Sequence, residues 1–181
     1  MIKLNDKVID FKHFNDGTFR WQLEDECTTY TILWLYSNDE EIIQLYYLAN
    51  HLRALASRLE LIMPYIPNAR QDRVNSYKDV FTLKYFCNLI NSIGFDKVYV
   101  FDPHSHVSEA LLNNVKVLTP KYLLLDLIED KLPVDTLVAY PDSGAEKRYR
   151  SMLKVPYVVG VKERDWETGA IRKLDILALS I

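Results

Sequence analysis

The sequence predicts an α/β fold in which a mostly parallel sheet carries helices on both faces. Short apolar runs of strand length alternate along the chain with longer segments whose apolar residues recur at helical spacing. Three of these runs end in polar clusters, at 70–73, 102–104 and 142–144. Open α/β sheets bind ligands at the edge where their parallel strands end. The three clusters are therefore expected to lie on that one edge.

The composition is that of a soluble globular protein. A chain of 181 residues, 49% hydrophobic and 26% charged, suffices for one domain, or for one domain and part of another. The net charge of −3 supplies no general basic field, so we expect no nucleic-acid partner and only a local anion site. The early charges exclude a secretory signal, and no apolar run approaches a membrane span. We expect a cytoplasmic protein that binds no membrane, with Cys27 and Cys87 both reduced.

Residues 1–36 have the pattern of β structure, with strands expected at 7–11, 19–23 and 30–36. Asn15, Asp16 and Gly17 are turn residues, and Gly17 accepts a positive φ, so the first two strands should form a hairpin.

A helix is expected at 39–56, and a strand follows at 59–63. The segment from Ser37 to Glu40 has the form of a capping box, and apolar residues then recur at helical spacing. Beyond the strand, two prolines keep the chain out of a helix before the first polar cluster, Arg70, Gln71, Asp72 and Arg73. Two guanidiniums flanking a carboxylate suit a phosphate-rich ligand, although a solvated loop with an Arg–Asp pair explains them equally well.

A second helix is expected at 78–93, capped by residues 76–79 and ended by Gly94, before a strand at 97–101. If the backbone stays extended beyond that strand, Asp102, His104 and His106 point the same way and could bind a metal. The alternative is that His106 begins the next helix.

The second half repeats the alternation of strands and helices, and its last polar cluster suggests an anion site. Pro141, Asp142 and Gly144 form a turn between a strand and a helix N-terminus, with Arg148 one helical turn further on. The proline-marked connection at 131–133 is a candidate domain boundary. Expected helices are 108–113, 121–130 and one that follows the glycine turn and ends near Lys154. Expected strands are 115–118, 135–140, 155–161 and 171–180.

Five motifs, in order along nearly the whole chain, carry a resemblance to a known family. They are Phe14-Asn-Asp-Gly-Thr18, Pro64-Tyr-Ile-Pro-Asn-Ala-Arg-Gln-Asp-Arg73, Asp102-Pro-His104, Pro141-Asp-Ser-Gly144 and Lys162-Glu-Arg164. They resemble the Phe-x-Asp-Gly-Glu hairpin, the Ala-Arg-Gln-Asp-Arg signature, the Asp-Leu-His and Pro-Asp-x-Gly-Gly motifs and the Lys-Arg-Arg arm of phosphoribosyl pyrophosphate synthetases (ribose-phosphate pyrophosphokinases).

The resemblance implies a phosphoribosyltransferase-like fold, with an ATP-side domain at 1–118 and an incomplete second domain with a catalytic arm at 119–181. It implies transfer of the β,γ-diphosphoryl group of ATP to the anomeric hydroxyl of ribose 5-phosphate. By matching position, ATP would be held by Arg70, Gln71 and Asp72, and by Phe14 and Asp16 of a neighbouring subunit. A homo-oligomer with the nucleotide site at a subunit interface is therefore implied.

The remaining roles also follow from the resemblance. Mg²⁺ would be held by His104, Asp142 and Asp102, and the sugar phosphate by Asp142, Gly144 and Arg148. Lys162 and Arg164 would close over the reacting phosphates as catalytic residues, because charge on the phosphate oxygens must be neutralised during transfer.

Departures from the family pattern leave other functions open. Thr18 stands in place of a glutamate, Ala145 in place of a second glycine, and Tyr149 in place of an alanine. The chain stops at Ile181, before the family's acceptor-phosphate loop, which implies a divergent and C-terminally truncated member. The alternatives are the same chemistry on ADP-ribose, as in phage-type NAD salvage, or a non-catalytic associated subunit.

Overall fold

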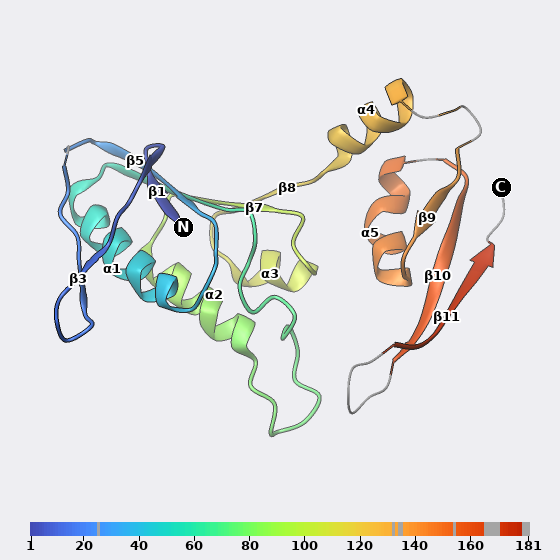
Figure 1. The fold of residues 1–181 in the computed structure, drawn as a ribbon, viewed down its shortest axis with the longest axis horizontal. Coiled ribbons are helices and arrows are strands. Elements are labelled where there is room, and N and C mark those ends of the chain that lie inside the picture. The colour runs from blue at the N-terminus through green and yellow to red at the C-terminus, as the bar shows by residue number, and fades with distance from the viewer. Residues whose placement is uncertain (25, 132, 134–135, 154, 165–170, 179–181) are drawn as a thin grey trace. The chain divides into compact units, whose positions relative to one another are not determined.

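The computed structural model describes the chain except for residues 25, 132, 134–135, 154, 165–170 and 179–181 (Figure 1). It divides into two compact units, Met1–Leu118 and Thr119–Ile181. The division falls between Leu118 and Thr119, so the proline-marked connection at 131–133 lies inside the second unit and is not the boundary. No helix in the described part of the chain is both long and apolar enough to cross a membrane.

The first unit is built on a six-stranded sheet of order β2-β1-β5-β6-β7-β8. The four strands from β5 to β8 are parallel, while β1 is antiparallel to both of its neighbours. The predicted α/β class with a mostly parallel sheet is therefore confirmed. The strands are β1 (Ile2–Leu4), β2 (Lys7–Val8), β5 (Thr29–Trp34), β6 (Arg58–Met63), β7 (Lys97–Phe101) and β8 (Val115–Leu118).

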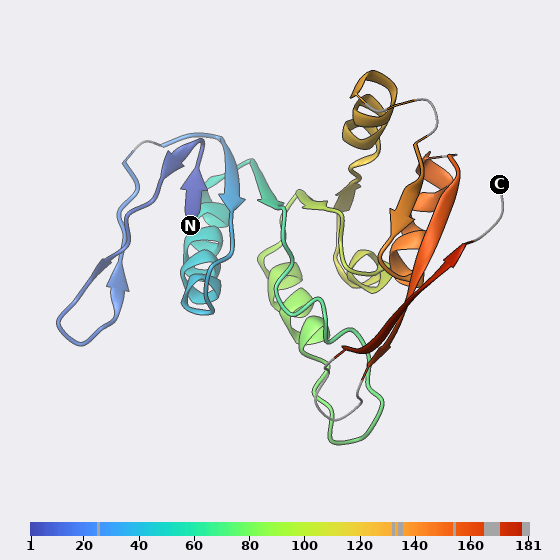
Figure 2. The same cartoon turned by 45° about the vertical axis from the view of Figure 1, so that its right-hand side comes forward.

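Three helices lie on the same side of this sheet in both views, so the prediction of helices on both faces is wrong for the described part of this unit (Figure 1 and Figure 2). They are α1 (Glu40–Leu55), α2 (Thr82–Ile93) and α3 (His106–Leu111), and α2 packs against the other two. Strand side chains alternate between faces, so one face of β5, β6 and β7 is fully buried beneath the helices. This core holds the ends of the parallel strands in place.

Near the start of helix α1, the glutamate that bonds back to the preceding residues is Glu41, one residue later than predicted. The carboxylate of Glu41 accepts hydrogen bonds from the backbone N–H and the hydroxyl of Ser37, at 2.9 and 2.8 Å. The Asn38 side chain accepts from the Glu41 N–H at 3.3 Å. The predicted partner Glu40 instead contacts His13 at 3.0 Å and Gln44 at 3.1 Å. The helix was predicted correctly, but its capping glutamate was not.

Helix α2 begins four residues after the predicted start. The Asp79 carboxylate accepts from the N–H groups of Asn75 and Ser76, at 2.9 and 2.8 Å, and so closes a turn in the preceding loop. The helix starts only after Phe81 and ends as predicted at Gly94, whose φ is +76°. The residues predicted to cap the helix therefore shape the loop before it.

The N-terminal strands are shorter than predicted. The predicted hairpin turn is present between β3 (Lys12–His13) and β4 (Phe19–Arg20), two residues each, but β3 lies just beyond the strand predicted at 7–11. Strand β1 was not predicted, and it forms a second hairpin with β2 through Asn5 and Asp6, both of which have positive φ.

The second unit has a three-stranded sheet of order β11-β10-β9, in which β9 and β10 are parallel. Its small core consists of Tyr140, Ala145, Leu153 and Val159. The predicted strand at 155–161 begins two residues later and runs on to Arg164. The elements are α4 (Lys121–Lys131), β9 (Val138–Tyr140), α5 (Ser143–Leu153), β10 (Tyr157–Arg164) and β11 (Ile171–Ala178).

We expect Gly160→Ala to destabilise the second unit. A Cβ at this position would lie 2.8 Å from the carbonyl oxygen of Pro141, and this backbone group cannot move without shifting the turn before α5. Overpacking of this kind costs about 1–3 kcal/mol. Urea unfolding followed by circular dichroism measures the change, with Val161→Ala at an exposed neighbour as the control. Equal stabilities of the wild type and Gly160→Ala would contradict this close contact.

Candidate functional site

Two of the predicted polar clusters follow neighbouring strands of the first unit. Met63 of β6 pairs with Val100 of β7, so the loops that follow begin side by side. The third cluster follows β9 in the second unit. It stays a prediction that the three polar clusters surround one ligand.

The loop after β6 presents Arg70 and Gln71 to solvent from a well-supported backbone. Asn68 has a φ of +62°, and its carbonyl accepts from the N–H of Gln71 at 3.0 Å. The Gln71 side chain accepts from the hydroxyl of Thr82 at 2.6 Å, which ties the loop to the start of α2. Arg70 is thus exposed on a turn that two hydrogen bonds of its neighbour Gln71 brace, and its guanidinium suits phosphate oxygens.

Asp72 differs from these neighbours because it is buried, with only 5% of its surface exposed. The Nε of Arg73 donates to its Oδ1 at 3.1 Å. Burial by itself would raise the pKa of Asp72, but the Ser105 side chain, Arg73 and His104 favour the charged form and lower that pKa overall. The carboxyl therefore stays ionised inside the protein.

The loop after β7 differs from the predicted extended strand end. Asp102 has a φ of +44°, and its N–H donates to the carbonyl of Leu118 at 2.9 Å. The backbone therefore turns at Asp102, and the prediction that Asp102, His104 and His106 point the same way is wrong. His106 begins α3, as the alternative reading proposed, and lies 3.5 Å from Glu109. His104 is exposed.

The hairpin β3–β4 presents Phe14 and Asp16 at its turn. Phe14 is 54% exposed, with the guanidinium of Arg20 5.7 Å from its ring centre. Asp16 accepts from the hydroxyl and the N–H of Thr18, at 2.7 and 3.0 Å, and these bonds lower its pKa. Thr18 therefore orients the neighbouring carboxylate.

In the second unit, Asp142 caps the N-terminus of α5. Its Oδ1 accepts from the N–H of Ala145 at 2.9 Å. A Cβ on Gly144 would lie 3.1 Å from the same oxygen, which explains the small residue there. One turn further on, the guanidinium of Arg148 lies 5.2 Å from the ring centre of Tyr149. The backbone of Lys162 pairs with Leu174, and that of Arg164 with Ile171 after a register shift. The side chains of these two predicted catalytic residues lie outside the described structure.

The predicted metal ligands are divided between the units, with Asp102 and His104 in the first and Asp142 in the second. Among the described residues, no group of three or more histidines, cysteines or carboxylates is arranged to hold a metal. Mg²⁺ prefers oxygen ligands and is commonly held by one or two carboxylates together with substrate phosphates. The predicted carboxylate ligands therefore suit a magnesium ion that is also coordinated by nucleotide phosphates. The described residues do not form a site in which protein ligands alone surround the ion.

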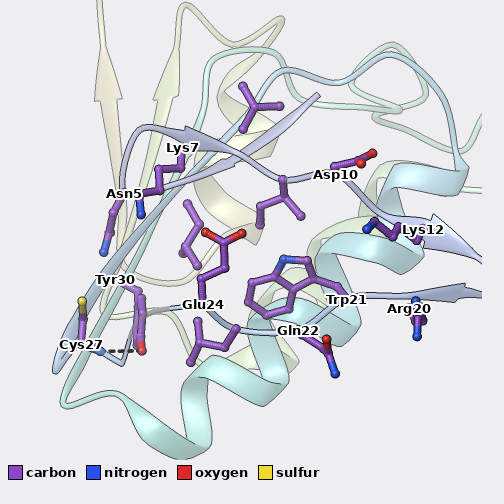
Figure 3. Close-up of a pocket in the computed structure, with 14 residues that line it drawn as sticks. Asn5, Lys7, Asp10, Lys12, Arg20, Trp21, Gln22, Glu24, Cys27 and Tyr30 are labelled. Carbon is purple, nitrogen blue, oxygen red and sulfur yellow. Dashed lines mark hydrogen bonds between the residues drawn. The ribbon is translucent and has the colours of Figure 1, made fainter.

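A cavity of about 570 Å³ lies between the strands β1 and β5 and the chain on either side of the β3–β4 hairpin (Figure 3). Trp21 and Glu24 lie at its centre in this view, and the hydroxyl of Tyr30 accepts from the N–H of Cys27 at 2.8 Å. None of the predicted site residues lines this cavity. It was not predicted, because its lining comes from segments without a recognisable motif.

The fold and the exposed donors at the ends of its parallel strands define an α/β protein with a candidate anion site at its sheet edge. The family model for the N-terminal domain of ribose phosphate pyrophosphokinase matches residues 2–94, just over half of the chain. The chain therefore belongs to the ribose-phosphate pyrophosphokinase family.

Individual relatives agree with this membership. The chain is 30% identical over 163 residues to ribose-phosphate pyrophosphokinase 1 of Listeria monocytogenes, covering 84% of this chain and 51% of the relative. It is 28% identical over 142 residues to ribose-phosphate pyrophosphokinase of Saccharolobus solfataricus, covering 76% and 48%. The chain thus spans about half the length of the curated relatives it matches.

A solved structure shows the same fold. The crystal structure of phosphoribosylpyrophosphate synthetase from Mycobacterium smegmatis superposes with a TM-score of 0.74 at 20% identity, covering 94% of this chain and 58% of that one. The phosphoribosyltransferase-like fold implied by the motifs is therefore confirmed.

Proposed function

We propose that this chain binds ATP and takes part in transferring its β,γ-diphosphoryl group to the anomeric hydroxyl of ribose 5-phosphate. The anomeric oxygen attacks the β-phosphorus, the bond from that phosphorus to the α,β-bridging oxygen breaks, and AMP leaves. The observation that carries this proposal is the pair Arg70 and Gln71, held exposed on a braced loop beside the loop of Asp102 and His104. Family membership supports the choice of reaction.

The nucleotide contacts are assigned from the exposed residues of the first unit. Arg70 donates to phosphate oxygens, and Gln71 donates its side-chain amide. Phe14 and Asp16, on a hairpin turn exposed to solvent, supply the adenine contact to the site of a second copy. This assignment makes the active form a homo-oligomer.

Asp102 and His104 are proposed to hold a magnesium ion bound to the phosphates, and Asp142 is proposed to complete its ligands from the second unit. When bound, Mg²⁺ neutralises charge on the transferring phosphoryl oxygens. Asp142, Gly144 and Arg148 are proposed to bind the sugar phosphate at the N-terminus of α5, where free N–H groups attract anions. Lys162 and Arg164 are the proposed cations over the reacting phosphates.

The proposal predicts release of AMP. Purified protein is incubated with ATP, Mg²⁺ and either ribose 5-phosphate or ADP-ribose, and the products are separated by ion-exchange chromatography. We expect AMP and a diphosphorylated sugar only when ribose 5-phosphate is present, and neither product from Arg70→Ala. The exposed Arg150→Ala is the matched control and should retain activity.

The other outcomes separate the alternatives. Release of AMP with ADP-ribose, but not with ribose 5-phosphate, would show that ADP-ribose is the acceptor and that the diphosphoryl transfer itself is as proposed. ATP binding without AMP from either acceptor would contradict catalysis and favour a non-catalytic associated subunit.

A further inference from the structure

The β3–β4 hairpin is too short to fix its own direction. Each of its strands has two residues, and an isolated two-stranded hairpin is at best marginally stable in water. Two hydrogen bonds close its turn. The N–H of Phe14 donates to the carbonyl of Thr18 at 2.7 Å, and the N–H of Gly17 donates to the carbonyl of Phe14 at 3.0 Å. Contacts with the rest of the first unit therefore have to set where the hairpin points.

An aromatic cluster supplies the first of these contacts. The ring of Phe19, in β4, lies 5.5 Å from that of Phe11 and 5.6 Å from that of Tyr47, measured between ring centres. Phe11 packs against the hydrophobic core of the first unit. Tyr47 belongs to α1 and is 60% exposed, so the core does not depend on its ring. The contact between Phe19 and Tyr47 joins β4 to the outer surface of α1.

A polar contact joins the other strand to the same helix. The Nε2 of His13, the last residue of β3, lies 3.0 Å from Oε1 of Glu40, the first residue of α1. The side-chain amide of Gln44, a buried residue, donates to that same oxygen at 3.1 Å and holds the carboxylate in place. An exposed pair of this kind contributes only modestly by itself. Both strands of the hairpin nevertheless contact α1.

We infer that Tyr47 is a positioning residue: its ring docks the β3–β4 hairpin on α1, and the hairpin then carries Phe14 and Asp16 toward the nucleotide site of a second copy. The contact between His13 and Glu40 supports the same docking. The inference rests on the proposed function for the identity of the ligand, whereas the docking rests on the contacts above.

Docking matters because the hairpin has to reach a second copy in one fixed direction. A hairpin that moved freely would have to be ordered each time a nucleotide bound, and the conformational freedom lost in that step would lower the affinity. A docked hairpin is already ordered. The adenine lies at the opposite end of ATP from the transferred phosphates, so the docking should strengthen binding of the base and leave binding of the phosphates unchanged.

Hydrogen exchange tests the docking without any nucleotide. In Tyr47→Ala, the amides of Phe14 and Gly17 should exchange about fivefold faster than in the wild type, because an aromatic pair is lost. Tyr47→Phe keeps the ring and should restore the wild-type rates. His51→Ala, at an exposed residue one turn further along α1, is the matched control. Wild-type exchange of these amides in Tyr47→Ala would overturn the inference.

Binding of two ligands distinguishes positioning of the base from a general loss of structure. We expect Tyr47→Ala to lower the affinity for ATP about fivefold, while the affinity for inorganic tripolyphosphate, which has no base, stays within about twofold of the wild type. Calorimetric titration in the presence of Mg²⁺ measures both affinities. Equal losses for the two ligands would show that Tyr47 supports the whole site and would overturn the inference. If the wild type binds neither ligand, the proposed function fails, and the exchange experiment still decides whether Tyr47 docks the hairpin.

Discussion

Lys162→Ala is expected to lower the rate of AMP formation by about a thousandfold, while ATP affinity stays within about threefold of the wild type. The proposed role of Lys162 is to neutralise charge that develops on the phosphoryl oxygens during transfer. Cations that act in this way contribute about 10³-fold or more to related phosphoryl transfers. Contacts made mainly in the transition state lower kcat when removed and leave ground-state binding nearly unchanged.

The comparison needs two further variants. Lys162→Arg keeps the cation and should recover part of the rate, whereas Lys147→Ala removes an exposed lysine of α5 and should have little effect. AMP release under single-turnover conditions gives the rate, and calorimetric titration with ATP gives the affinity. A parallel loss of rate and ATP affinity in Lys162→Ala would show that the lysine binds the ground state, contrary to its assigned role.

Elements with a long or uninterrupted pattern could be predicted closely from the sequence. The helix expected at 39–56 is α1 (Glu40–Leu55), and the strands expected at 97–101 and 115–118 have those bounds in the structure. Their apolar residues face one large core, so pattern and packing agree. The short strand β1 was missed because its formation depends on pairing with both β2 and β5, and three residues carry no usable pattern.

The candidate site was predictable as motifs but not as geometry. Arg70 and Gln71 were recognised by their residue types and do lie exposed at the sheet edge. The burial of Asp72 was not predictable, because its sequence neighbours Gln71 and Arg73 are exposed and no local pattern marks a single buried residue in such a loop. The turn at Asp102 was also hidden, since an aspartate tolerates a positive φ but does not require one.

Glu41 is a buried carboxylate with several hydrogen-bond donors around it, although no motif drew attention to it. It is 8% exposed, and its oxygens accept from the indole N–H of Trp34 at 2.9 Å, from Ser37 and from the N-terminal ammonium. Burial alone would raise the pKa of Glu41, but these donors outweigh it and lower the pKa. The folded protein therefore favours the ionised carboxylate more than the unfolded chain does.

We expect Glu41→Gln to lower the free energy of unfolding by about 3 kcal/mol at pH 7, because an amide cannot accept all of these bonds and leaves buried donors unpaired. The matched control is Glu40→Gln, at an exposed neighbour in the same helical turn, and it should change stability by less than about 0.5 kcal/mol. Urea unfolding monitored by Trp fluorescence measures both differences.

The pH dependence of this difference identifies its cause. A carboxyl whose pKa is lowered in the folded state contributes its full stability above the ordinary value of 4.5 and loses it as the pH falls through the lowered value. The difference in the free energy of unfolding between the wild type and Glu41→Gln should therefore be constant from pH 7 to pH 6 and should become smaller below pH 4.5. Other carboxyls with lowered pKa values, such as Asp96, are common to both proteins and cancel in the comparison. If this difference in the free energy of unfolding stayed the same at acidic pH, the loss of stability in Glu41→Gln would come from side-chain packing and not from the charge of Glu41.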